Sequence, residues 1–233
     1  MVANKKQLLN ELVVRMEAEA GNLPLAGSPN NIVPAEGNPE AQIFFIGEAA
    51  GFHELQQRRP FVGAAGQLLT KTLVANGIKR EDVWISNVVK ARPPENRDPL
   101  PDEIAAYRPY LDQELNIIRP KIVVTLGRFS MGKFLGPDVR ISQVHGQARW
   151  MNFFPQPANL STFKPVNLRF VLLPMYHPAA ALRAGIIMTA FTEDFKKIPI
   201  ILKKILKVQT SDKMESTTKI EEKKEEARQL SLI

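Results

Sequence analysis

Polar side chains that could do chemistry stand where four apolar runs of the sequence end. A carboxylate can orient or activate water, an imidazole can donate to a developing oxyanion, and an amide offers a donor and an acceptor together. If the runs are parallel strands, their carboxyl ends meet at one edge of a sheet, and the polar residues converge on one crevice. The runs are Gln42–Ile46, Val83–Val89, Lys121–Leu126 and Arg169–Met175, and the polar residues are Glu48, Asn87, Ser130 and His177.

Two glycine- and proline-rich loops leave the first two runs. Gly47–Gly66 carries Phe61, whose ring could stack on a planar ligand, and Lys90–Pro99 carries Asn96 and Arg97. Loops of this kind can grip phosphates through backbone N–H groups and arginine side chains. Each residue type also has an ordinary structural role, since asparagine forms turns, histidine can be a satisfied turn residue and phenylalanine fits a core. Their common placement at strand ends favours a site.

Helical patterns separate the strand-like runs. Strands that alternate with helices predict βαβ units, a parallel sheet and therefore an α/β fold. We expect a long irregular excursion over 146–168 and a basic helix from Phe191 to Val208 that Pro199 breaks or kinks. The other helices are expected near 4–20, 66–77, 102–118 and 128–135.

The composition limits the class of protein. The chain has 233 residues, 44% of them hydrophobic, and no cysteine, which excludes disulfides, thiolate nucleophiles and cysteine-held metals. No signal peptide or membrane span is visible, so a cytoplasmic protein is expected. The net charge of +7 suits a polyanionic partner. We expect one domain over 1–208 and a charged C-terminal tail over 209–233 that is a disordered tether or, alternatively, a solvated helix.

Five motifs in order resemble the uracil-DNA glycosylase superfamily, and family 4 in particular, over about residues 30–200. The resemblance implies a three-layer α/β/α sandwich with a four-stranded parallel sheet. It also implies a DNA repair hydrolase of base excision repair, which flips uracil out of DNA and hydrolyses its N-glycosidic bond to leave an abasic site. The motifs are Ile46–Gly51, Arg59–Gly66, Ser86–Lys90, Arg92–Pro99 and His177–Arg183.

The resemblance also implies roles for single residues. Phe61 would stack on uracil, Asn87 would read its O4 and N3–H edge, and His177 would hydrogen-bond its O2 as negative charge builds. Glu48 would place or polarise the water that attacks C1′, and Gly47 belongs to the same uracil pocket. Asn96, Arg97, Ser130 and Arg183 would contact DNA, while His53 and Glu54 are secondary candidates.

The chain departs from the family pattern. Family 4 has four cysteines that hold a [4Fe–4S] cluster; two of these positions match Ala91 and Tyr107, and the other two fall in 17–25. We therefore expect no cofactor and no metal, with Tyr107, Leu23 and Leu25 as apolar replacements. The first loop has Ala50 where the family has proline, Leu55 where it has an acid, and Arg58 where it has glycine.

The last five residues resemble the peptide with which bacterial repair proteins dock on the replication sliding clamp. The alternative is a frayed end without function. These residues are Gln229, Leu230, Ser231, Leu232 and Ile233.

Two further hypotheses remain beside a monomeric uracil-DNA glycosylase. The altered first loop favours a protein that binds uracil-containing DNA with weak or no catalysis. The third hypothesis is a glycosylase for another deaminated base, such as hypoxanthine.

Overall fold

The computed structural model describes residues 4–155 and 166–208. The chain divides into two units, Met1–Lys196 and Lys197–Ile233. The described part of the second unit is a helix over 197–208 with Pro199 in its first turn, where a missing backbone N–H costs no helical hydrogen bond. The predicted tail 209–233, with its terminal peptide, lies outside the described residues.

The first unit is built on one sheet of six strands in the order β1-β3-β2-β4-β6-β5. The four inner strands are parallel and the two edge strands are antiparallel to their neighbours. The inner strands are β2 (Ile43–Gly47), β3 (Trp84–Asn87), β4 (Ile122–Leu126) and β6 (Leu168–Met175); the edges are β1 (Glu36–Gly37) and β5 (Arg149–Phe153).

The sequence therefore predicted the inner strands but missed both edges. Glu36–Gly37 is too short to show a pattern, and Arg149–Phe153 lies in the stretch 146–168 that we expected to be irregular. Edge strands bury one face at most, so they lack the continuous apolar run of an inner parallel strand. A sheet of four strands is thus a correct description of the parallel core and an incomplete one of the whole sheet.

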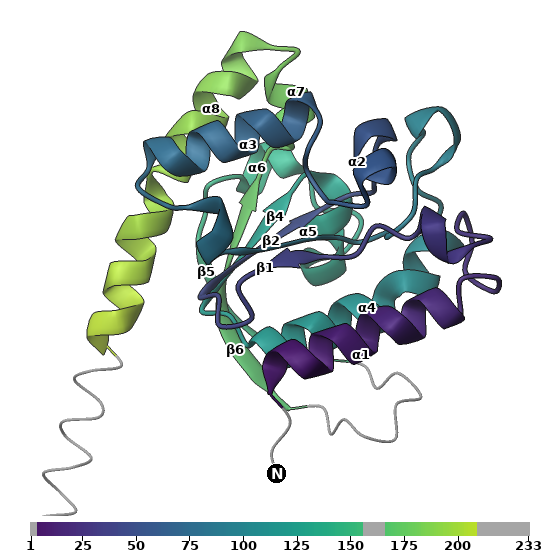
Figure 1. Cartoon of the computed structure of the whole chain (residues 1–233). Coiled ribbons are helices and arrows are strands. Elements are labelled where there is room, and N and C mark those ends of the chain that lie inside the picture. Colours follow the sequence, from purple (N-terminus) through teal and green to yellow (C-terminus); the bar gives the residue numbers. More distant parts are fainter. Residues whose placement is uncertain (1–3, 156–165, 209–233) are drawn as a thin grey trace, which may run out of the picture. The chain divides into compact units, whose positions relative to one another are not determined.

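Helices cover both faces of the sheet (Figure 1). On one face, α1 (Lys5–Ala18), α4 (Pro101–Ile118) and α5 (Arg128–Leu135) pack over a core that includes Phe44. On the other face, the ring of Phe45 stacks on Phe195 of α8 (Gly185–Phe195), with centroids 5.9 Å apart. Successive side chains of β2 thus enter opposite layers, as the period of a strand requires.

The remaining helices are short apart from α3 (Ala64–Ala75), which the sequence predicted within two residues. Three of the short ones, which the periodicity did not reveal, are α2 (Phe52–Gln57), α6 (Ile141–Val144) and α7 (Pro178–Ala181). Short 3₁₀ turns occupy Pro29–Asn31, Arg80–Asp82 and Pro94–Asn96. Helices of four to six residues contain too few turns for an apolar period to appear.

The strand order has a functional consequence. The chain runs from β2 to β3 on one side and then crosses to β4 on the other, so the order reverses at β2. In open α/β sheets, ligands bind outside the carboxyl ends of the strands at such a point. No helix in the described part of the chain is long and apolar enough to span a membrane.

Candidate active site

A cleft of about 640 Å³ opens at the carboxyl edge of the parallel strands. Its lining comes from the first loop, the end of β3, the proline-rich loop, the start of α5 and the segment after β6. The structure thus brings together residues that lie up to 139 positions apart in the sequence, from Glu48 to Ile187. The predicted site residues among them are Glu48, Phe61, Asn87, Asn96, Arg97, His177 and Arg183.

Phe61 lies across Gly47, and both positions depend on close packing. A methyl group at Gly47 would lie 2.4 Å from Phe61 Cζ and 2.3 Å from Asn87 Oδ1. A methyl group at Gly66 would lie 2.0 Å from the Phe61 carbonyl. Glycine at position 47 lets the Phe61 ring lie against the end of β2, and glycine at position 66 lets the Phe61 backbone lie against α3. Phe61 is buried apart from this face and is therefore both a core residue and part of the cleft wall.

Glu54 holds the backbone that carries Phe61. Phe61 has a positive φ of 53°, which is uncommon for a residue other than glycine. One oxygen of Glu54 accepts hydrogen bonds from Val62 N (2.9 Å) and Gly63 N (2.8 Å), directly after the strained residue. Glu54 also lines the cleft. From the sequence, Glu54 was only a secondary candidate, because nothing in its spacing shows that it accepts hydrogen bonds from residues eight and nine positions later.

Asn87 ends β3 with its side chain in the cleft wall. The residue is 3% exposed, and its Oδ1 has no hydrogen-bond partner among the described residues. An unpaired buried carbonyl oxygen costs free energy, about 1–3 kcal/mol, unless a ligand supplies a donor. A hydrogen-bond donor on a bound ligand would remove this cost.

A buried ion pair lies beside Asn87. Lys90 Nζ is 2.7 Å from Glu114 Oε1 of α4, and it also bonds the hydroxyl of Ser86. Ser86 in turn donates to Glu114 Oε2 at 2.6 Å. Burial lowers the pKa of Lys90, while Glu114 acts in the opposite direction. Since breaking one partner of a buried pair leaves an unpaired charge, this network fixes the end of β3 against α4.

His177 is oriented by the backbone that follows it. Its Nδ1 accepts a hydrogen bond from Ala179 N at 3.1 Å, so a neutral ring carries its proton on Nε2. Burial, as the largest cause, lowers the pKa of His177 to about 4, so the ring is neutral near pH 7. The imidazole and Phe61 rings have centroids 5.8 Å apart. The site therefore holds a neutral N–H donor next to the aromatic ring.

Glu48 has an unusually high proton affinity. Its pKa is raised to about 7: burial is the largest cause, the nearby charge of Asp98 acts in the same direction, and Arg128 acts in the opposite direction. Asp98 and Arg128 form an ion pair with each other and both line the cleft. A carboxyl group that titrates near neutral pH can accept a proton from water, which suits a general base.

Three of the residues predicted to contact DNA, Asn96, Arg97 and Arg183, line the cleft, and their side chains differ in their hydrogen-bond partners. Arg97 forms two hydrogen bonds to Glu103, at 2.6 and 2.9 Å, and Glu103 caps α4 by accepting from Leu100 N. Asn96 accepts from Arg92 Nε at 2.9 Å. Arg183 lines the cleft close to His177, and its side chain donates no hydrogen bond to any residue that the structure describes. Arg97 thus contributes a positive charge to the proline-rich loop and also holds this loop to the start of α4.

Ser130 is a correction. We expected it to contact DNA, but it is fully buried in the first turn of α5, where its hydroxyl donates to Leu126 O at 3.1 Å. It does not line the cleft. A serine three residues into a helix can bond back to a carbonyl of the preceding turn, and this local bond competes with any outward role.

Arg58 explains one departure from the family pattern. Its φ is 50°, in the left-handed region that favours glycine. The side chain offsets the strain because its Nε donates to Ile32 O at 3.0 Å and its guanidinium pairs with Glu17. The first loop is therefore attached to α1 and to the segment after it.

The residues at the expected cluster positions do not fit an iron–sulfur cluster. The sequence has no cysteine, and the described residues include no group of three or more metal-binding side chains. Ala91 and Tyr107 are both fully buried in one apolar core cluster, with Leu23 and Leu25 packed against it. The Tyr107 hydroxyl donates to Pro24 O at 2.8 Å.

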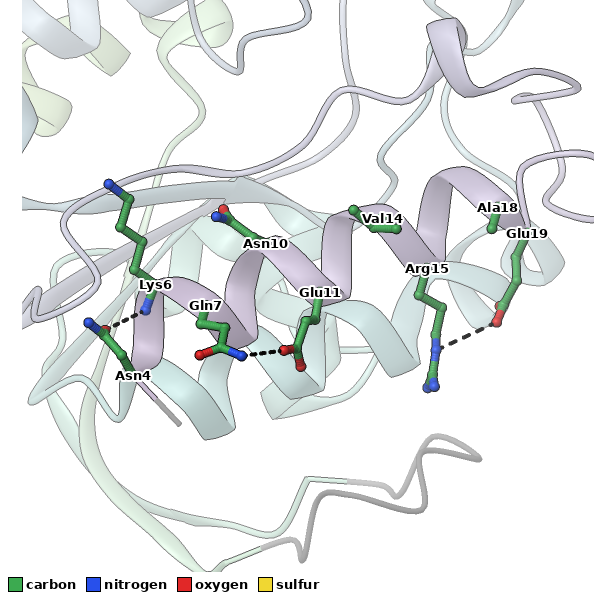
Figure 2. Close-up of a pocket in the computed structure, with 9 residues that line it drawn as sticks. All are labelled: Asn4, Lys6, Gln7, Asn10, Glu11, Val14, Arg15, Ala18 and Glu19. Atoms are coloured by element: carbon green, nitrogen blue, oxygen red, sulfur yellow. Dashed lines mark hydrogen bonds and ion pairs between the residues drawn. The ribbon is translucent and has the colours of Figure 1, made fainter. Parts of the chain in front are cut away.

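A second depression, of about 800 Å³, lies on the outer face of α1 (Figure 2). The described residues that line it all belong to one stretch, Asn4–Glu19. Their polar groups largely pair with each other: Gln7 donates to Glu11 at 2.9 Å, and Arg15 lies 4.0 Å from Glu19. This surface has the character of a solvated helix face and not of a site.

The fold and the cleft define an α/β protein with a cleft at the carboxyl edge of its parallel strands. The model of the Uracil DNA glycosylase superfamily matches residues 34–198. The chain belongs to this superfamily. Three similar proteins are type-4 uracil-DNA glycosylases. That of Sulfurisphaera tokodaii is 45% identical over 174 residues, 72% of this chain and 73% of the relative. Those of Saccharolobus solfataricus (43% over 170 residues; 72% and 74%) and Archaeoglobus fulgidus (38% over 194 residues; 80% and 89%) are similar too.

Proposed function

We propose that this protein is a uracil-DNA glycosylase, a hydrolase that releases uracil from DNA and leaves an abasic site. The observation that carries the proposal is the buried Asn87 Oδ1, which has no partner among the described residues and lies near the Phe61 ring, itself next to the ring of His177. Uracil N3–H is a donor at the edge that such an oxygen accepts from, and cytosine has an acceptor there. The similarity to type-4 uracil-DNA glycosylases supports the same conclusion.

In this mechanism, binding precedes chemistry. The glycosidic bond is out of reach inside a base stack, so the nucleotide flips into the cleft. Phe61 stacks on the uracil ring, and Asn87 accepts from N3–H and donates to O4. Because the site replaces the base's lost stacking and pairing partners, it selects uracil by shape and by hydrogen-bond pattern together.

The chemical step breaks the bond between C1′ and N1. Electrons of that bond move onto the base, and negative charge develops at O2, where His177 Nε2–H donates a hydrogen bond. A water molecule attacks C1′ and gives its proton to the Glu48 carboxylate. The products are an abasic deoxyribose with a hydroxyl at C1′ and uracil released as its N1 anion, which then takes a proton from solvent while Glu48 gives its proton back to solvent. Asn96, Arg97 and Arg183 contact the DNA backbone at the rim.

An oligonucleotide with a single uracil tests the function. After incubation with the enzyme, alkali breaks the strand at abasic sites, so we expect a break at uracil and none at thymine in the same position. A strand that stays intact while the protein binds it would contradict the enzyme and favour the uracil-binding hypothesis, for which Ala50 and Leu55 gave reason. Hypoxanthine in the same position tests the third hypothesis.

The pH dependence of excision tests Glu48. The pKa of Glu48 is raised to about 7, and only the ionised carboxylate accepts the proton, so kcat/KM should rise with pH and level off above about pH 7. Below that pH, the rate should fall about tenfold per pH unit, while His177 stays neutral down to about its own pKa of 4.

Two variants separate Glu48 from other titrating groups. Glu48→Gln should give a low kcat/KM that no longer rises between about pH 5 and pH 7; this rise is called the acid limb of the pH profile. Asp98→Asn removes a negative charge near Glu48, which favours the ionised form and should shift the limb to lower pH. An unchanged limb in Glu48→Gln would contradict the assignment.

We propose further that residues 1–208 form the glycosylase-like domain and that 209–233 are a charged tail whose last residues, Gln229–Ile233, bind a bacterial sliding clamp. The support is the sequence similarity to clamp-binding peptides. A clamp pull-down with the full chain and with a chain ending at Arg228 should retain only the former. Equal retention would contradict the proposal. A monomeric state and a cytoplasmic location stay predictions of the sequence.

A further inference from the structure

An exposed aromatic–arginine pair stands beside the cleft and has no part in the mechanism above. Phe52, the first residue of α2, is 49% exposed. The guanidinium carbon of Arg92 lies over its ring, 5.3 Å from the centroid, and the ring of His53 meets it edge-on at 5.4 Å. A single exposed aromatic residue is ordinary on a protein surface, so it is the cation over this ring and the position of the pair next to the cleft that point to a ligand.

Both members of the pair are held next to residues that line the cleft. Phe52 directly follows Gly51, and Arg92 directly precedes Pro93; Gly51 and Pro93 are in the lining. Arg92 Nε also donates to Asn96 Oδ1 at 2.9 Å, and Asn96 lines the cleft as well. The pair therefore joins the first loop to the proline-rich loop at the rim of the cleft.

We propose that Phe52 and Arg92 form a stacking shelf for the nucleobase next to the flipped uracil in the same DNA strand. This inference rests on the proposed function. An aromatic ring accepts the face of any base, so the shelf would be tolerant of sequence. A guanidinium on the ring adds a cation that suits both a base face and the adjacent phosphate.

The flipping reaction supplies the physical reason for such a shelf. When uracil leaves the stack, each neighbouring base loses a stacking partner, and this loss opposes flipping. A base that moves onto Phe52 regains a stacking surface, so the shelf lowers the free energy of the flipped state. Because Phe52 directly follows Gly51 in the cleft lining, we expect the base that stacks on it to be the immediate neighbour of the uracil in the cleft.

The shelf predicts a loss of activity that depends on the neighbouring base. On a single-stranded oligonucleotide with one uracil, Phe52→Ala should lower kcat/KM roughly tenfold, and Phe52→Trp should retain it, because stacking on an aromatic side chain is sequence-tolerant and of that order. On an oligonucleotide with abasic spacers on both sides of the uracil, the wild type and Phe52→Ala should differ by less than about twofold. Spacers on one side at a time identify the neighbour.

A matched control removes an exposed phenylalanine elsewhere. Phe154 is 61% exposed and follows β5, whose end pairs with the start of β6, at the edge of the sheet opposite the cleft. Phe154→Ala should leave kcat/KM and its dependence on spacers unchanged. An equal loss for Phe52→Ala on natural and spacer-flanked oligonucleotides, or no loss on either, would overturn the shelf.

A binding measurement keeps this test separate from the proposed function. Fluorescence anisotropy with an oligonucleotide that carries a tetrahydrofuran abasic analogue in place of uracil reports affinity without catalysis. Phe52→Ala should weaken this affinity roughly tenfold, and only when a base adjoins the analogue. If the wild type released no uracil, the proposed function would fail, while this measurement would still decide whether Phe52 binds a base.

Discussion

His177→Ala is expected to lower kcat/KM for uracil excision by roughly 10²–10³-fold, the usual cost of losing one preorganised donor to a developing oxyanion. The reason lies in the geometry of the imidazole. Ala179 N–H donates to Nδ1, which leaves the single proton on Nε2, and burial lowers the pKa to about 4 so that the ring stays neutral. A neutral donor needs no change of protonation state to stabilise the charge on uracil O2.

His177→Gln is the conservative counterpart of this change. Glutamine keeps an N–H donor on a side chain of similar reach, so it should retain more activity than alanine. His177 also caps α7, and loss of the cap costs about 1 kcal/mol of stability, so thermal unfolding should be measured for both variants. Equal activity of His177→Ala and the wild type in folded protein would contradict the assignment.

Asn87→Ala is expected to have an effect of similar size, by a different route. The variant loses the donor and the acceptor that read the uracil edge, so the base is bound weakly and without orientation. We expect kcat/KM to fall by roughly 10²-fold or more, as for other losses of oriented, desolvated contacts. Inhibition by free uracil, measured with the wild type, should disappear in Asn87→Ala, because the same contacts hold the product.

Asn76→Ala is the matched control for that change. Asn76 lies at the C-terminal end of α3, where its amide donates to Thr72 O at 2.8 Å, and it is not part of the cleft lining. Its replacement should leave both excision and uracil inhibition unchanged. If Asn87→Ala kept full sensitivity to free uracil, the residue would not contact the base.

The periodicity of the sequence was sufficient for the parallel core of the fold. Runs such as Gln42–Ile46 and Lys121–Leu126 correspond to β2 and β4 within one residue, because strands buried on both faces are apolar throughout. The helix predicted over 102–118 begins at Pro101, since proline at the first turn and acids after it are strong start signals. Edge strand β5 and helix α2 were missed because their patterns are short and half-polar.

The candidate site was predictable where its residues stand at strand ends. Glu48, Asn87 and His177 were found from that placement alone, and the cleft contains all three. The prediction for Ser130 was wrong because the same placement also suits a hydroxyl that bonds back to the end of the preceding strand, here to Leu126 O of β4. Glu54 was undervalued because its role depends on the fold of a loop, which no local pattern encodes.

The sequence by itself determined the kind of fold and the residue types at the site, because both follow from local features: apolar periodicity, glycine and proline signals, and motifs of a few adjacent residues. The tertiary structure alone decided what those residues can do. Gly47 shows the difference. Its lack of a side chain matters only because Phe61 and Asn87 occupy the space within 2.4 Å of where a methyl group would lie. Likewise, the pKa values of Glu48 and His177 depend on burial and on charges that distant segments supply.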